Sequence, residues 1–107
     1  MPAWADASAE IERLELMQSI DGLAAENARQ FVSGVARGGV VSCDQVDANG
    51  YRKSVLLDWK TSAIQVEICD SAYEVYLLNS TKVDVRTFNH KPGGAWPDVM
   101  MELLPKP

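Results

Sequence analysis

Long apolar runs are missing from this 107-residue chain, and no stretch approaches the roughly 20 consecutive apolar residues that a membrane-spanning helix needs. The first ten residues, MPAWADASAE, have neither a basic start nor an apolar stretch, so a secretory signal is not expected. With 47% hydrophobic and 23% charged residues and no internal repeat, the composition is typical of a globular protein. We therefore expect one soluble, cytoplasmic domain over residues 1–107.

Cysteine and histidine are scarce, and the chain contains only Cys43, Cys69 and His90. Two cysteines are too few for a disulfide framework, and they lack the paired spacing of a zinc site. The strand alternation described below predicts that the two cysteines lie on opposite faces of a sheet, so neither a shared metal ion nor a disulfide is expected. We therefore predict that the protein binds no metal ion and no cofactor.

Basic residues are outnumbered, because 10 lysines and arginines face 15 aspartates and glutamates, for a net charge of −5. Residues 1–30 hold six of these acids and only two arginines, a net −4. A negative field of this kind repels phosphate backbones and attracts cationic surfaces. Direct nucleic-acid binding is therefore not expected, and a basic protein is the natural electrostatic partner.

Residues 8–37 show the period of an amphipathic helix. A single helix of 30 residues would be ~45 Å long, whereas strands of six or seven residues span only ~20–24 Å. The segment SIDG at 19–22 contains capping residues and a glycine. We therefore predict a break between Ser19 and Leu23 that divides the segment into two helices, the second ending at Gly38 or Gly39.

After Gly39 the apolar residues alternate with a period of two, which predicts five strands at about 40–47, 51–59, 63–69, 73–79 and 83–88. A turn at residues 47–50 (DANG) and the three later loops predict the cross-strand pairs: Cys43–Val55, Val41–Leu57, Leu57–Val66, Val55–Ile68, Ile68–Val75 and Leu77–Val85. One apolar face results, made of Val41, Val55, Leu57, Val66, Ile68, Val75, Leu77 and Val85.

The predicted fold class is therefore α+β: an N-terminal helical segment of two helices packs on a five-stranded antiparallel meander. The stretch DVMMELL, which starts at residue 98, predicts a short C-terminal helix that Pro105 ends. This helix either covers the second face of the sheet or leaves it open, and the sequence does not decide between the two arrangements.

No catalytic motif stands out, and no catalytic residue is assigned. Cys69 and His90 lack a third residue that would orient them, and Glu67 with Glu74 would need a pocket that raises the pKa of one carboxyl group. The glycine-containing loop at 89–98 matches no phosphate-binding fingerprint. A small enzyme with a cleft between residues 89–96 and the sheet remains the alternative interpretation.

The preferred hypothesis is a small acidic, intracellular protein-binding module that acts as a stoichiometric inhibitor. Proteins of similar build occur among immunity and anti-defence proteins of bacterial or phage origin, an analogy that rests on fold alone. The second sheet face mixes aromatic and charged side chains, as binding surfaces do. The predicted partner is another protein or a second copy of this chain, as a homodimer, and the predicted partner-binding residues are Glu12, Glu15, Glu26, Glu67, Tyr76, Arg86 and Phe88.

Overall fold

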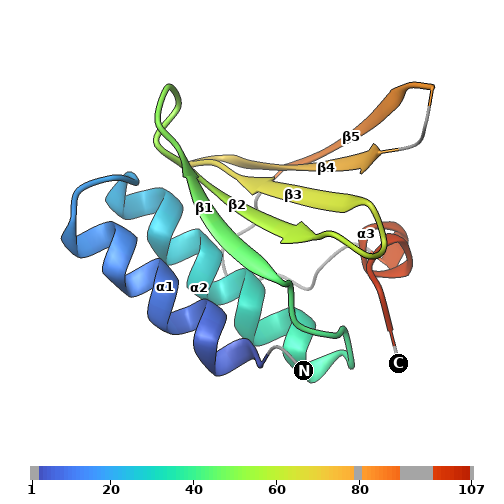
Figure 1. The fold of residues 1–107 in the computed structure, drawn as a ribbon, viewed down its shortest axis with the longest axis horizontal. Helices are drawn as coiled ribbons and strands as arrows, with labels where there is room; N and C mark the ends of the chain where they lie inside the picture. Colours follow the sequence, from blue (N-terminus) through green and yellow to red (C-terminus); the bar gives the residue numbers. More distant parts are fainter. Residues whose placement is uncertain (1–2, 79–80, 90–97, 107) are drawn as a thin grey trace.

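The computed structural model describes residues 3–78, 81–89 and 98–106, and it shows helices on one face of an antiparallel sheet (Figure 1). The helices are α1 (Trp4–Leu16), α2 (Gly22–Arg37) and α3 (Asp98–Leu103). The strands are β1 (Gln45–Asn49), β2 (Ser54–Trp59), β3 (Ile64–Ile68), β4 (Ala72–Leu78) and β5 (Val83–Asn89), in the spatial order β1-β2-β3-β4-β5. The predicted α+β fold with a five-stranded meander is confirmed.

The predicted break in the helical segment is also confirmed, because α1 ends at Leu16 and α2 begins at Gly22. Gln18 lies between them with a left-handed φ of 59°. At the far end of α2, Gly39 has φ 82°, a conformation that glycine adopts without steric cost. None of the helices in the described part of the chain is long and apolar enough to cross a membrane.

The helix α1 begins at Trp4, before both Asp6 and Ser8, the two residues that the sequence offers as its cap. Its N-cap residue, Ala3, makes no side-chain capping hydrogen bond. The indole Nε1 of Trp4 instead donates to the backbone oxygen of Val40 at 2.9 Å. A tertiary contact, which local sequence signals cannot reveal, therefore holds the first turn.

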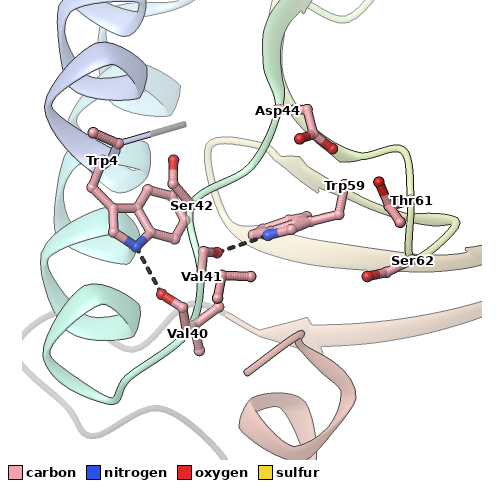
Figure 2. Close-up of a pocket in the computed structure, with 9 residues that line it drawn as sticks. Trp4, Val40, Val41, Ser42, Asp44, Trp59, Thr61 and Ser62 are labelled. Carbon is pink, nitrogen blue, oxygen red and sulfur yellow. Dashed lines mark hydrogen bonds between the residues drawn. The ribbon is translucent and has the colours of Figure 1, made fainter. Parts of the chain in front are cut away.

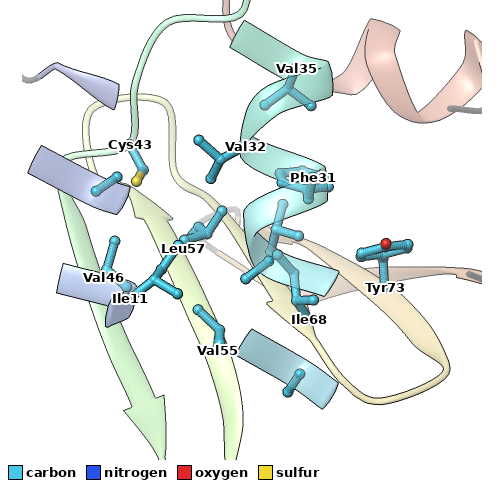
Figure 3. Close-up of a cluster of buried hydrophobic side chains, with 14 of the residues drawn as sticks. Ile11, Phe31, Val32, Val35, Cys43, Val46, Val55, Leu57, Ile68 and Tyr73 are labelled. Carbon is cyan, nitrogen blue, oxygen red and sulfur yellow. The ribbon is translucent and has the colours of Figure 1, made fainter. Parts of the chain in front are cut away.

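The core lies between the helices and the inner face of the sheet, where Ile11, Phe31 and Val35 pack with side chains of the central strands (Figure 3). Five residues of the predicted apolar face are fully buried: Val55, Leu57, Val66, Ile68 and Val75.

Met100 in the short helix α3 and Leu104 directly after it join this same core, and the backbone N–H of Val41 donates to Pro105 O at 2.9 Å. All three helices therefore lie on the inner side, and no described helix covers the other face (Figure 1). Of the two arrangements that the sequence left open, the structure has the one in which α3 leaves the second face uncovered.

The first strand differs from its prediction, because β1 begins at Gln45 and not near residue 40. The predicted partners Val41 and Cys43 therefore precede the strand, although Cys43 is still buried in the core. The observed pairs are Val46 with Leu57 and Ala48 with Val55.

The turn explains this difference. Asn49 Oδ1 accepts the backbone N–H groups of Tyr51 and Arg52 at 3.1 and 3.4 Å, and the N–H of Lys53 bonds to Asn49 O at 2.7 Å. An asparagine that bonds to the backbone two residues ahead starts a turn. The turn therefore follows Asn49, whereas the prediction placed it at residues 47–50.

The later hairpins show how loop length controls which face a residue occupies. The predicted pair Leu57–Val66 is confirmed. Val66, not Ile68, pairs with Val75, a shift of an even number of residues that keeps the apolar face intact.

The last hairpin is shifted by an odd number of residues, because Val85 pairs with Tyr76 and not with Leu77. The prediction used a loop of three residues, but β4 ends at Leu78 and β5 begins at Val83. A slip by one residue reverses every side chain. Val85 is therefore 46% exposed on the opposite face, and its predicted place in the core is wrong.

Candidate functional site

The face of the sheet turned away from the helices, called the outer face below, carries side chains from every strand. One row across the sheet contains Asp47, Leu56, Glu67, Glu74 and Thr87, and the next contains Gln45, Asp58, Gln65, Tyr76 and Val85. Leu78 and Val83 pair beyond these rows, towards the β4–β5 hairpin.

Glu67 is the most deeply buried charged residue of the outer face, with only 2% of its surface exposed. Its carboxylate accepts hydrogen bonds from Asn49 Nδ2 at 2.9 Å and from the Ser54 hydroxyl. On its other oxygen it accepts the Tyr76 hydroxyl at 2.9 Å and Arg52 Nη1 at 3.1 Å. Four donors, three from the β1–β2 hairpin and one from β4, thus satisfy one buried carboxylate, as burial of a charge requires.

A second carboxylate belongs to the same network. Glu74 lies opposite Glu67 on the neighbouring strand, and its Oε1 is 3.4 Å from Nη1 of Arg52. The Tyr76 hydroxyl also bonds to Glu74, so one hydroxyl proton is shared between two acids. Among the described residues, Arg52, whose side chain is 43% exposed, is the cation that forms ion pairs with both carboxylates.

This network favours a structural role for Glu67 over acid–base catalysis. Burial alone raises the pKa of the Glu67 carboxyl, but the hydrogen bonds from Ser54, Tyr76 and Asn49 outweigh it and lower the pKa below the ordinary 4.5. Burial and the neighbouring carboxylates hold the pKa of the Tyr76 hydroxyl well above its usual range. Glu67 is therefore an ionised hydrogen-bond acceptor at neutral pH and a poor general base.

Neither cysteine has the properties of an activated nucleophile. Burial raises the pKa of Cys43 to about 11, and burial together with the charge of Glu67 raises that of Cys69. Both are free thiols. Across the described ranges no three His, Cys, Asp or Glu side chains group as metal ligands would. His90 and most of the predicted 89–96 cleft lie outside the described residues.

The other end of the outer face is apolar and exposed. Leu78 and Val83 pair across β4 and β5, with 39% and 55% of their surfaces exposed, and Val85 lies beside them next to Tyr76. Exposed aliphatic side chains that form a contiguous patch beside polar groups are typical of interaction sites.

Two of the predicted binding residues are not on the outer face. Arg86 pairs with Val75, and Phe88 pairs with Tyr73, so both side chains point to the inner side. Phe88 packs partly buried against the core, and Arg86 is bonded to Asp84 at 3.2 Å. The prediction that Tyr76 and Arg86 are neighbours on the outer face is therefore wrong. The cause is the same one-residue shift in the last hairpin.

The acidic residues predicted on the helices lie apart from the outer face. Glu12 and Glu26 are exposed, on α1 and α2. Glu15 is half-buried, and its Oε1 is 2.7 Å from Arg29 Nη1. The structure thus brings Glu67 and Tyr76 together and leaves the helical acids on the other side of the molecule.

A pocket of about 350 Å³ lies between the start of α1, the segment before β1 and the β2–β3 turn (Figure 2). Trp4 and Trp59 line it, with ring centres 6.0 Å apart in an edge-on arrangement. Both indole N–H groups are engaged, Trp4 with Val40 O and Trp59 with Val41 O at 2.8 Å (Figure 2). The tryptophans thereby hold the segment between α2 and β1 in place.

Asn49, Arg52 and Ser54 were missed as members of the network. The sequence contains a signal for two of them, since Asn49 precedes a glycine and Ser54 is a polar residue at the start of an apolar strand. The prediction placed the turn too early, so Arg52 was assigned to a strand and its side chain was not related to Glu67.

The chain was compared with protein-family models, curated proteins and solved structures, and none of them matched it.

Proposed function

We propose that this chain is a protein-binding module that acts by forming a stoichiometric complex, with the outer face as its contact surface. The observation that carries the proposal is the patch of Leu78, Val83 and Val85, exposed on a face that no described helix covers. Burying such aliphatic surface contributes roughly 25 cal/mol per Å². A partner that covers this patch would therefore remove apolar surface from water, which stabilises the complex.

The charges of the outer face favour a basic partner. Asp47, Asp58, Glu67 and Glu74 lie on this face, and among the described residues bonded to them only Arg52 is basic. The helical side is acidic as well, so a cationic partner is attracted from any direction. Steering of this kind raises the association rate, while the apolar patch sets the dissociation rate.

The network around Glu67 supports binding by holding the face in one conformation. Four donors fix the carboxylate, and Tyr76 and Arg52 are fixed in turn. A rigid surface loses less conformational entropy on association than a mobile one. In this proposal Glu67 acts indirectly, because its own side chain is buried, and Tyr76 and Arg52 make the contact.

An inhibitor of the immunity or anti-defence kind is the class of binding protein we favour, since blocking a partner requires a surface and no catalytic group. The test uses the purified chain as bait in bacterial lysate, followed by identification of the captured protein and the stoichiometry of the complex. Leu78→Asp places a charge in the patch, and Leu23→Asp makes the same change at a 52% exposed leucine on α2.

The expected result is one protein retained in an equimolar complex by the wild type and Leu23→Asp, and lost with Leu78→Asp. Equal retention by both variants would remove the outer face from the proposal. Turnover of a substrate by the purified chain alone would replace binding by catalysis as the function.

A further inference from the structure

The strand β5 is an edge strand, because among the described residues it pairs only with β4. Its seven residues run from Val83 to Asn89. The side of an edge strand that faces away from its neighbour presents unpaired N–H and C=O groups, which can pair with another strand. Val83 and Val85 are about half exposed here, which is unusual for valine in a strand.

The charges of β5 are arranged symmetrically about Val85. Asp84 precedes it and Arg86 follows it, both on the inner side, with Asp84 Oδ2 and Arg86 Nη2 3.2 Å apart. Their side chains are 42% and 49% exposed. Both charged groups therefore remain accessible to a strand that approaches the free edge.

Symmetry limits how two copies of this strand can pair. In an isologous antiparallel pair, residues directly opposite each other have side chains on the same face of the sheet. One residue of β5 must therefore lie directly opposite its own copy, an arrangement called here an axis through that residue. If a residue instead lay opposite its neighbour in the sequence, an inward side chain would face an outward one. Few registers remain.

The charges decide among the three registers centred on Asp84, Val85 and Arg86, in the middle of the paired strand. An axis through Asp84 places this aspartate opposite its own copy, and an axis through Arg86 does the same for the arginine, and like charges directly opposite are destabilising. An axis through Val85 places Asp84 of each copy opposite Arg86 of the other. It also places Val85 against Val85 and Val83 against Thr87 on the outer face, which are favourable pairs of β-branched residues.

We infer that a second copy of this chain pairs antiparallel along β5, centred on Val85, so that one sheet runs through both copies. Two crossed Asp84–Arg86 ion pairs set the register, and the exposed valines of the two copies cover each other. The pairing shares Val83 and Val85 with the proposed contact surface, but its register depends on Asp84 and Arg86, which lie on the inner side of the sheet. Substitutions at these two residues therefore test the pairing, whereas Leu78→Asp tests the proposed function.

Charge exchange tests the inference by sedimentation equilibrium with protein at up to about 1 mM, which detects even weak association. The wild type is expected to dimerise, and Asp84→Arg or Arg86→Asp alone to weaken the dimer at least about tenfold through like-charge opposition. An equimolar mixture of these two variants pairs opposite charges at both positions, so it should form a heterodimer. The double variant Asp84→Arg/Arg86→Asp should recover the homodimer.

The matched control is Asp47→Arg on β1, at the other edge of the sheet, which should dimerise as the wild type does. Hydrogen exchange of the wild type alone gives a second measurement, since β5 amides should become more protected as the concentration rises. A wild type that stays monomeric throughout the range, or a mixture that associates no better than its components, would overturn the inference.

Discussion

At Glu67, burial and hydrogen bonding act on the carboxylate in opposite directions. Burial disfavours the charged form, whereas donors from Asn49, Ser54 and Tyr76 favour it, and the donors outweigh burial. The residue was predicted as part of a binding surface, but only 2% of it is exposed. Local alternation predicts which face a side chain occupies, but it does not predict that neighbours will cover it.

Replacing Glu67 by alanine should lower the free energy of unfolding by roughly 3 kcal/mol, because several buried donors lose their acceptor. Arg52→Ala should cost only about 1 kcal/mol, since Arg52 is 43% exposed and its charge is hydrated. Urea denaturation of both variants measures the difference. Equal losses would mean that the Glu67 hydrogen bonds have little energetic weight.

The lowered pKa of Glu67 also predicts a pH dependence. A carboxyl whose pKa is lower in the folded than in the unfolded chain stabilises the fold above the unfolded value, here about 4.5, and this contribution is lost as the pH falls through the folded value. Glu67→Gln should therefore be less stable than the wild type at pH 7, and the gap should narrow below pH ~4.5. Denaturation midpoints across this range test it, with Glu12→Gln as the control for net charge.

At the scale of elements, the sequence predicted what depends on local period and not what depends on turn length. Alternation predicted all five strands. The β3–β4 pairing is shifted by an even number of residues, so each side chain still lies on its predicted face. The predicted pairing of the last hairpin was wrong by one residue, so Val85, Arg86 and Phe88 each lie on the face opposite to the predicted one. The predicted bounds of the first strand were wrong because the side chain of Asn49 begins the turn later than predicted.

Alanine substitutions separate the two faces directly. Ile68→Ala removes a fully buried side chain from the inner face and should cost about 2–5 kcal/mol, through lost transfer energy and the cavity left behind. Val85→Ala and Gln65→Ala, on the outer face, should each cost less than about 0.5 kcal/mol in dilute protein. A loss at Val85 as large as that at Ile68 would contradict the observed β4–β5 pairing.

At the scale of the whole molecule, negative charge is present on both sides of the sheet. Exposed aliphatic residues occur at one end of the outer face, at Leu78, Val83 and Val85, and also near the α1–α2 connection, at Leu16, Met17 and Leu23. The sequence predicted the acidity and the meeting of Glu67 with Tyr76. It did not predict Arg52 as the compensating cation, because the turn that carries Arg52 was misplaced. The apolar patch was missed for a related reason, since Val85 was assigned to the core.

The central claim is that the outer face holds the partner protein, and the dissociation rate of the purified complex tests it most directly. Residues at the centre of an interface mainly change dissociation, whereas distant charges mainly change association and its salt dependence. Leu78→Ala should therefore speed dissociation about tenfold, while Leu23→Ala leaves it unchanged and Glu12→Lys with Glu15→Lys slows association. Unchanged dissociation for Leu78→Ala, together with faster dissociation for the helical charge reversals, would place the contact on the helices and contradict the claim.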